Sequence, residues 1–171
     1  QIKNENRNIL KASTYGTGLL IKDALSRGCK EIILGVGGSA TNDGGAGIFE
    51  ALGGKLLDKK GESLERGGGS LSSLESIIPP QIPKSIKWKV ACDVNNPLLG
   101  SFGSSTIYGP QKGASKTDIK ILEKSLTQFS KVLEKQFKRS ITKIKGGGAA
   151  GGAAAGMHGF FNASLISGFS I

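Results

Sequence analysis

The stretch "GVGGSATNDGGAG", residues 35–47, holds six glycines in thirteen positions and directly follows the apolar run "EIIL". A short isoleucine-rich run bounded by glycine is typical of a buried strand in a parallel or mixed sheet, so we predict a strand over Glu31–Val36. The segment "GIFEALGG" that follows predicts a short helix ending at Gly53 and Gly54. Residues 35–47 are therefore expected to lead from the carboxyl end of a strand into a helix.

Two further segments flank this unit. In "TGLLIKDALSRG" the side chains of Leu20, Ala24 and Leu25 share one helical face, which predicts a helix over residues 17–27. Gly28 is placed to end that helix in the left-handed conformation. After the short helix, "KLLD" followed by "KKGE" is typical of a strand that enters a turn.

The second half of the chain predicts another strand and a long helix. Residues 64–87 offer glycine, serine and three prolines without a sustained period, so irregular structure is expected there. "WKVACDV", residues 88–94, alternates large and small or polar side chains, which predicts a strand that delivers Asp93 at or near its carboxyl end. Apolar residues recur at spacings of three and four over residues 115–139, which predicts an amphipathic helix with Ser115 as its N-cap.

Length and composition fit one compact domain. The chain has 171 residues, of which 27 are glycine and only five are proline, without a collagen-like period. We therefore expect a single α/β domain over residues 1–171, with a mixed sheet, flanking helices and glycine-rich loops at the strand ends.

The net charge of +10 allows nucleic acid, anionic lipid or an acidic small molecule as partners, and charge alone does not choose among them. Glu123 and Glu134 interrupt the lysines of the long helix, which favours a solvated face. Cys29 and Cys92 form no C-x-x-C motif and are expected to be reduced thiols. No apolar stretch approaches the ~20 residues that span a bilayer, so we expect a cytoplasmic protein without a membrane partner. Nucleic acid is not the expected partner either, because the lysines of the long helix are better explained as a solvated face.

The opening stretch partly matches a dinucleotide-binding turn. "GVGGSA" satisfies G-x-G-x-x-A after a strand, and Asp58 lies where an acidic residue could meet a ribose hydroxyl. However, that turn should open a helix at once, whereas residues 41–45 are all poor helix formers. A P-loop is also disfavoured, because no lysine followed by serine or threonine closes a glycine cluster.

What remains is a polar glycine loop that either binds a ligand or only turns the chain. Asp43 in this loop could ligate Mg²⁺, hold a substrate hydroxyl or cap the next helix, and Asp93 has the same three options. Lys112, in "GPQKGA", is either a counter-charge for phosphate or carboxylate or a surface lysine. Near the C-terminus, the small residues over 146–156 could let the backbone approach a ligand closely or begin a helix.

Several linked motifs resemble, in order and spacing, those of the bacterial glycerate kinase family: "GTG" at residues 16–18, the stretch 35–47, "ACDVNNPLLG" at 91–100, "GPQKGA" at 109–114 and "GGGAAGG" at 146–152. The resemblance implies ATP-dependent phosphorylation of D-glycerate to 2-phosphoglycerate by a two-domain α/β enzyme. Family members are about twice this length, so the chain looks like the second, inserted domain, whose partner is the missing other domain. Leu19 departs from the glutamate or glutamine that usually follows the "GTG" motif.

The resemblance also implies a set of site residues. Asp93, Asp43 and Lys112 are expected to be catalytic, Asp43 or Asp93 could hold Mg²⁺, and the cofactors would be ATP and Mg²⁺. The substrate or phosphate groups would contact Gly37, Gly38, Ser39, Thr41, Asn42, Asn96, Gln111, Gly146, Gly147 and Gly148. Two alternatives stay open, an NAD- or NADP-binding oxidoreductase domain and a basic nucleic-acid-binding module, and the oligomeric state is not predicted.

Overall fold

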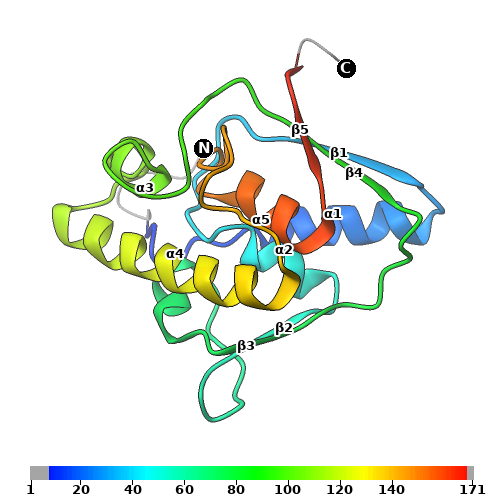
Figure 1. Ribbon diagram of the computed structural model, residues 1–171, viewed down its shortest axis with the longest axis horizontal. Helices are drawn as coiled ribbons and strands as arrows, with labels where there is room; N and C mark the ends of the chain where they lie inside the picture. The colour runs from blue at the N-terminus through cyan, green and yellow to red at the C-terminus, as the bar shows by residue number, and fades with distance from the viewer. Residues whose placement is uncertain (1–7, 169–171) are drawn as a thin grey trace.

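A parallel sheet joins three strands that are far apart in the sequence. In the computed structural model, which describes residues 8–168, β1 (Glu31–Gly35), β4 (Lys87–Ala91) and β5 (Ser164–Ile166) lie in the order β1-β4-β5. Both strand pairs are parallel (Figure 1). Gly35 lies opposite Ala91, so β1 and β4 end side by side and their following loops leave from the same edge.

The expected mixed sheet is wrong in one respect, because the antiparallel pairing forms a separate two-stranded sheet of β2 (Lys55–Leu57) and β3 (Ser76–Ile78). A turn with Gly53 at φ 99° directs the chain away from β1 just before β2 begins. The side chain of Gln136 then bonds both the amide and the carbonyl of Ile77, which ties β3 to the long helix α4.

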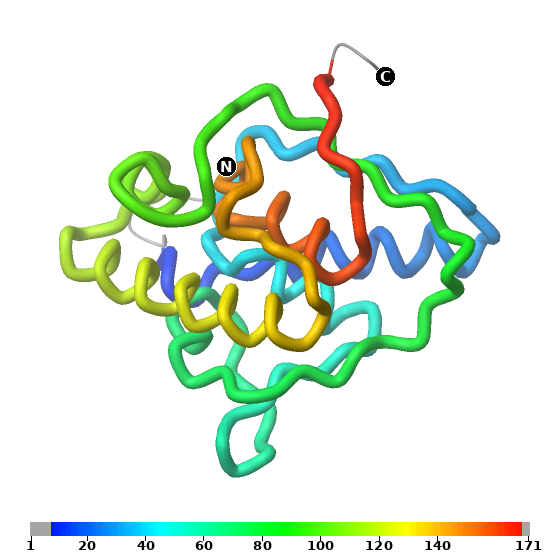
Figure 2. Tube along the Cα trace, viewed as in Figure 1, coloured from blue at the N-terminus to red at the C-terminus, as the bar shows by residue number. Residues whose placement is uncertain are grey.

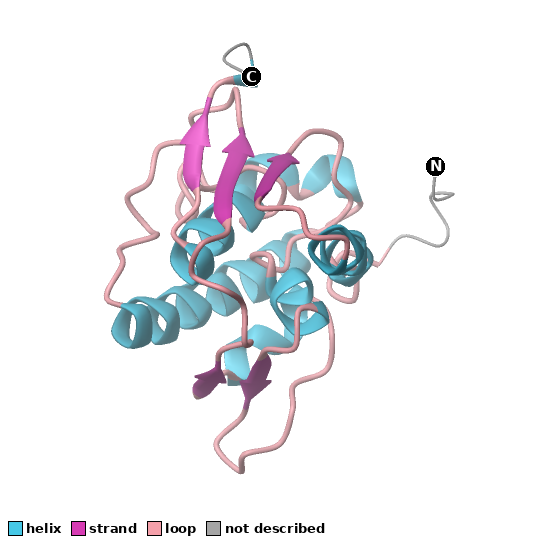
Figure 3. Ribbon diagram, turned by 90° about the vertical axis from the view of Figure 1, so that its right-hand side faces the viewer, coloured by secondary structure: helices cyan, strands magenta, loops and turns pink. Residues whose placement is uncertain are grey.

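The helices gather mainly on one side of the parallel sheet (Figure 3). They are α1 (Tyr15–Ser26), α2 (Ala46–Ala51), α3 (Ser104–Tyr108), α4 (Lys116–Phe137) and α5 (Ala153–Phe161), with 3₁₀ turns η2 (Gly68–Ser73) and η3 (Pro110–Lys112). Trp88 and Val90 of β4 are buried against this helical layer, whereas the alternate residue Lys87 is exposed on the other face. The period-two burial of a strand thus fixes which face of the sheet carries the core.

The long helix confirms its sequence pattern. Ser115 accepts a hydrogen bond from the Asp118 amide, and the Asp118 carboxylate accepts one from the Ser115 amide, which completes a capping box at the start of α4. The apolar stripe of Leu122, Leu126 and Phe129 is fully buried. The helices predicted around α1 and α2 and the strands predicted around β1, β2 and β4 are also confirmed, with small shifts of their ends. The expected burial of β1 is wrong, because only Ile32 of this strand is buried and Ile33 is exposed.

Other elements were not predicted. The segment 64–87, expected to be irregular, contains η2 and β3. The short helix α3, the turn η3 and the strand β5 also carried no detectable period, because each is only three to five residues long. In the described range 8–168, no helix has both the length and the apolar character needed to cross a bilayer.

Glycines allow α1 and α2 to touch backbone to backbone. A Cβ atom on Gly18 would lie 2.6 Å from the Ala51 Cβ and 2.8 Å from the Ile48 Cα. A Cβ atom on Gly47 would lie 2.3 Å from the Tyr15 amide nitrogen. These contacts are far below van der Waals distance, so the crossing of α1 and α2 requires glycine at both positions.

Replacing Gly18 by alanine should therefore destabilise the fold, because the backbone of α2 cannot yield as a flexible side chain would. We expect Gly18→Ala to lower the free energy of unfolding by about 1–3 kcal/mol in urea titrations, the usual cost of overpacking. Gly16→Ala is the matched control in the same helix, since nothing lies within 4 Å of its added Cβ. Equal stability of the two variants would contradict the close crossing.

Candidate functional site

The carboxyl edge of the parallel sheet collects four loops. Residues 36–45 follow β1, and residues 92–98 follow β4. The amide of Val36 donates to the Ala91 carbonyl and continues the pairing of the two strands to their ends. In open α/β sheets, ligands bind beyond the carboxyl ends of the strands. The segments 101–113 and 146–152 are hydrogen-bonded to these two loops, as described below.

Asp43 lies in the interior of this assembly. Its side chain is 0% exposed, and its Oδ2 accepts from the Thr14 amide at 2.7 Å and from the Thr14 hydroxyl at 2.9 Å. The amides of Gly47 and Gly45 donate to Oδ2 and Oδ1 at 3.2 and 3.1 Å. Burial raises the pKa of the Asp43 carboxyl, and the hydrogen bonds from Thr14, Gly45 and Gly47 oppose that rise.

Both Asp43 oxygens are thus occupied, which corrects the expectation that this carboxylate faces substrate or Mg²⁺. The Asp43 carboxylate instead holds neighbouring backbone segments in position. One carboxylate joins the residue that precedes α1, the loop after β1 and the first turn of α2.

Asn42 has a similar internal place. It is fully buried, its Nδ2 donates to the Ser105 hydroxyl, and its Oδ1 accepts from the Ser104 hydroxyl. Asn42 was expected to contact substrate directly. The structure instead uses it to fasten the loop after β1 to the first turn of α3.

Lys112 is buried rather than exposed, which rules out the surface-lysine interpretation. Its residue is 8% exposed, and its Nζ donates to the Ser39 hydroxyl at 2.9 Å and to the Thr41 carbonyl at 2.7 Å. Burial lowers the pKa of Lys112 to about 8, and the charge of Asp43 opposes that shift. Lys112 therefore brings an ammonium group against the middle of the loop after β1.

The same loop borders a cavity of about 230 Å³ whose lining includes Ser13, Thr17 and Thr41 together with residues 35–37, 39 and 40. The hydroxyl oxygen of Thr41 is buried and has no hydrogen-bond partner among residues 8–168. Within residues 8–168, no acceptor is bonded to the amides of residues 37–41. A buried hydroxyl and a row of unused amides are donors suited to an anionic ligand.

Ser13 and Thr17 were missed as site residues from the sequence. Both flank the start of α1, where the first helical amides lack intrahelical acceptors. The "GTG" motif at residues 16–18 marked this helix start, but its spacing did not show that the helix faces the loop after β1.

Asp93 offers the exposed carboxylate of this edge. It lies two residues beyond the end of β4, in agreement with its predicted place near the carboxyl end of a strand. The Ser167 hydroxyl and the Gly168 amide both donate to its Oδ1 at 2.9 Å. No hydrogen bond to Oδ2 is made by residues 8–168, so one oxygen remains available to a ligand.

Two further expected residues lie at the same edge with different surroundings. Asn96 donates from Nδ2 to the Phe102 carbonyl, and its Oδ1 accepts from the Tyr108 hydroxyl at 2.6 Å. Its side chain therefore braces the loop after β4. Gln111 is exposed beside the buried Lys112.

The glycine segment 146–148 packs against the loop after β4. A Cβ on Gly148 would lie 2.3 Å from the Pro97 carbonyl oxygen, and one on Gly146 would lie 2.9 Å from the Val94 carbonyl oxygen. The amides of Gly147 and Gly148 already donate to the carbonyls of Ile144 and Asn96. The expectation that these two amides receive phosphate oxygens is therefore wrong.

Comparison with known proteins shows the family of this chain. The model of the Glycerate kinase family matches residues 1–171. The chain belongs to the glycerate kinase family. The chain is 47% identical to a glycerate kinase of Halalkalibacterium halodurans over 99% of this chain and 46% of that protein. It is 46% identical to the glycerate 2-kinase of Escherichia coli over 98% of this chain and 45% of that protein.

A solved structure agrees with the fold. A crystal structure described as glycerate kinase 2 from Salmonella typhimurium LT2 superposes with a TM-score of 0.95 at 41% identity, over 99% of this chain and 46% of that one. The chain thus spans about half the length of the glycerate kinases it matches.

The buried ammonium of Lys112 should make stability depend on pH. The folded protein releases this proton near pH 8, whereas the ordinary value of 10.5 holds in the unfolded chain. Between these pH values the unfolded chain binds more protons, so the free energy of unfolding should rise as pH increases, by roughly 2–3 kcal/mol.

Lys112→Met should lack this rise in urea titrations across the same pH range, while the exposed-site control Lys120→Met should keep it. If wild type and Lys112→Met show the same pH dependence, the ammonium of Lys112 is not desolvated as the structure indicates.

Proposed function

We propose that this chain forms one wall of the active site of an ATP-dependent kinase that phosphorylates the 2-hydroxyl of D-glycerate. The proposal rests on its family and on the name of the Escherichia coli relative, glycerate 2-kinase. The chain would be the inserted domain of the longer enzyme, and the rest of the protein would supply the opposite wall.

The observation that carries the proposal is the pairing of Asp93 with an anion-suited cavity at one sheet edge. Asp93 follows β4, the cavity follows β1, and these strands end side by side. The Oδ2 atom of Asp93 is free of protein donors in the described range. An acidic group on the same sheet edge as an anion-suited cavity suits a substrate that carries both a hydroxyl and a carboxylate.

The residues support a simple division of labour in phosphoryl transfer. Asp93 would orient the glycerate 2-hydroxyl and accept its proton while the hydroxyl oxygen attacks the γ-phosphorus and ADP leaves. The Thr41 hydroxyl and the amides of residues 37–41 would receive the substrate carboxylate or phosphate oxygens. Lys112 would hold that loop in place and add positive potential beneath it.

The site also fits a magnesium ion that is held mainly by ATP. Residues 8–168 contain no cluster of three or more His, Cys, Asp or Glu side chains. Mg²⁺ in kinases is held by one or two carboxylates together with substrate phosphates and water, and Asp93 Oδ2 is the available carboxylate oxygen here. The ion would neutralise charge that develops on the phosphates.

The dinucleotide-binding alternative is not supported. The chain after β1 does not enter a helix until Ala46, and β2 belongs to a different sheet from β1. Asp58 follows β2 in that separate sheet and lies in the turn that its Oδ1 organises by accepting from the amides of Lys60 and Glu62, so it does not belong to the carboxyl edge of the parallel sheet.

Removing the charge of Asp93 in the full-length enzyme should impair chemistry without unfolding the protein. We expect Asp93→Asn to lower kcat/KM for D-glycerate by ~10²-fold or more in a coupled assay of ADP release. Its melting temperature should stay close to wild type, because Asp93 is exposed. The control is Asp23→Asn, which changes an exposed aspartate on α1, far from Asp93 in the sequence. This variant should keep full activity.

Near wild-type kinetics for Asp93→Asn would remove this residue from the site. Absence of any glycerate-dependent ADP release in the wild-type full-length enzyme would refute the proposed function itself.

A further inference from the structure

A second and larger cavity lies at the opposite end of β4 from Asp93. Its volume is about 660 Å³, and it is enclosed by the segment 79–89, the end of α4 and the junction of α5 with β5. Figure 2 shows the segment between β3 and β4 running along the outside of the molecule, away from α5. Pro79, Pro80 and Pro83 restrict the backbone of this segment. We call residues 79–86 the arch, and the three prolines make it stiff.

The floor of this cavity is aromatic. The rings of Phe49 and Phe160 stack with centroids 3.9 Å apart, and those of Trp88 and Phe161 stack at 4.6 Å. Phe137 meets Phe160 edge to face at 5.8 Å. Phe49 is fully buried, so it supports the ring of Phe160 from inside the core, and Phe137, Phe160, Phe161 and Trp88 form the fixed apolar surface on which a flat ligand ring can pack.

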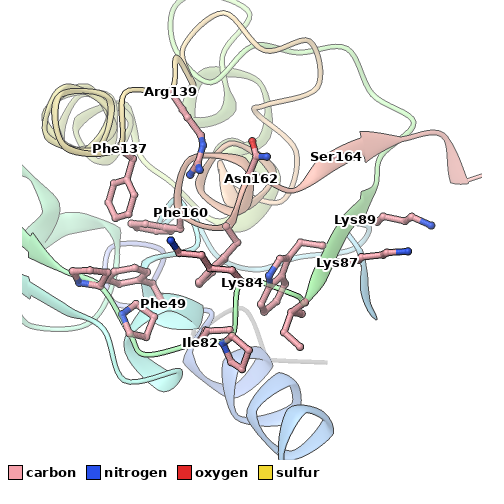
Figure 4. Close-up of a pocket in the computed structure, with 16 residues that line it drawn as sticks. Phe49, Ile82, Lys84, Lys87, Lys89, Phe137, Arg139, Phe160, Asn162 and Ser164 are labelled. Carbon is pink, nitrogen blue, oxygen red and sulfur yellow. The ribbon is translucent and has the colours of Figure 1, made fainter. Parts of the chain in front are cut away.

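Two cations face that floor. Figure 4 shows the side chains of Lys84, from the arch, and Arg139, just past α4, both directed toward Phe160 and Phe137. Arg139 is held in place because its Nη1 donates to the Gly159 carbonyl at 2.9 Å, which leaves its other guanidinium donors for a ligand.

Other lysines at the rim do not contribute in the same way. Lys87 and Lys89 extend away from the cavity (Figure 4), and Lys89 pairs with Glu31 at 2.7 Å. In the described part of the chain, no acidic residue lines the cavity to neutralise Lys84 or Arg139. Lys84 and Arg139 therefore place positive charge, which no lining carboxylate compensates, above the aromatic floor.

We infer that this cavity, which we call the arch pocket, binds an anion that carries a flat apolar ring, namely an aryl phosphate or a nucleoside monophosphate. The ring would pack on the aromatic floor, and Lys84 and Arg139 would bind the phosphate. The volume lies within the range of small-ligand sites. This assignment does not depend on the proposed kinase activity, because the arch pocket shares no residue with the cavity beside the Gly-rich loop.

The only tryptophan of the chain reports on this site directly. Trp88 lines the arch pocket, so ligand binding should change its fluorescence. We would titrate the 171-residue chain with phenyl phosphate and with AMP, and use inorganic phosphate and phenol as controls. We expect the fluorescence of Trp88 to change saturably with phenyl phosphate or AMP, and inorganic phosphate and phenol to bind more weakly. Comparing phenyl phosphate with AMP shows whether the ligand is an aryl phosphate or a nucleoside monophosphate.

Variants localise the signal. Lys84→Gln and Arg139→Gln should each raise the dissociation constant about tenfold, since each removes a charge-assisted contact. Lys120→Gln, an exposed lysine of α4, should leave it unchanged. Lys84 is itself exposed, so its variant stays informative even if Arg139→Gln proves unstable.

Three results would overturn the inference. The first is no saturable response to either ring-bearing probe, and the second is equal binding in Lys84→Gln and wild type. The third is binding by the 171-residue chain that calorimetry no longer detects in the full-length enzyme, because the arch pocket would then be covered by the rest of the protein.

Discussion

A carboxylate that leaves water loses several kcal/mol of solvation unless hydrogen-bond donors replace the water around it. Asp43 meets this condition with the amide and hydroxyl of Thr14 and the amides of Gly45 and Gly47. The three residues that supply these donors belong to different parts of the edge: Thr14 to the start of α1, Gly45 to the loop after β1 and Gly47 to the first turn of α2. The need to satisfy one buried charge thus sets the positions of three segments at once, and the cavity beside the Gly-rich loop lies between two of them.

Glycine makes this arrangement sterically possible. Gly18 and Gly47 let the backbones of α1 and α2 meet, and Gly148 lets its segment lie against the carbonyl of Pro97. By contrast, Gly37 and Gly38 are exposed, and an added Cβ would meet nothing within 4 Å. The glycine-rich sequence therefore serves two needs, which are close packing under the site and an open backbone at its surface.

The sequence predicted the elements that carry a long or clear pattern, such as α4 with its capping box and the isoleucine-rich run of β1. It did not predict β3 and β5, because three residues carry no usable period and their pairing depends on distant partners. Within the candidate site, the motifs marked loops that meet at the carboxyl edge of the parallel sheet, but Asp43 and Asp93 are the same residue type after two strands. Only the packing shows that one is buried among four donors and the other is exposed. For Gly146–Gly148, composition indicated a close approach of the backbone, but not that the approaching group is another loop rather than a ligand.

The central claim is that Asp43 holds the site together while Asp93 remains free to act. The most direct test is the free energy of unfolding of Asp43→Asn and Asp93→Asn, measured in urea on the same chain. An amide at position 43 would point N–H groups at existing donors, so we predict that Asp43→Asn lowers the free energy of unfolding by about 2–4 kcal/mol. Asp93 is exposed, so Asp93→Asn should lower it by less than about 0.5 kcal/mol. Equal stability of Asp43→Asn and wild type would show that the buried carboxylate does not organise this edge.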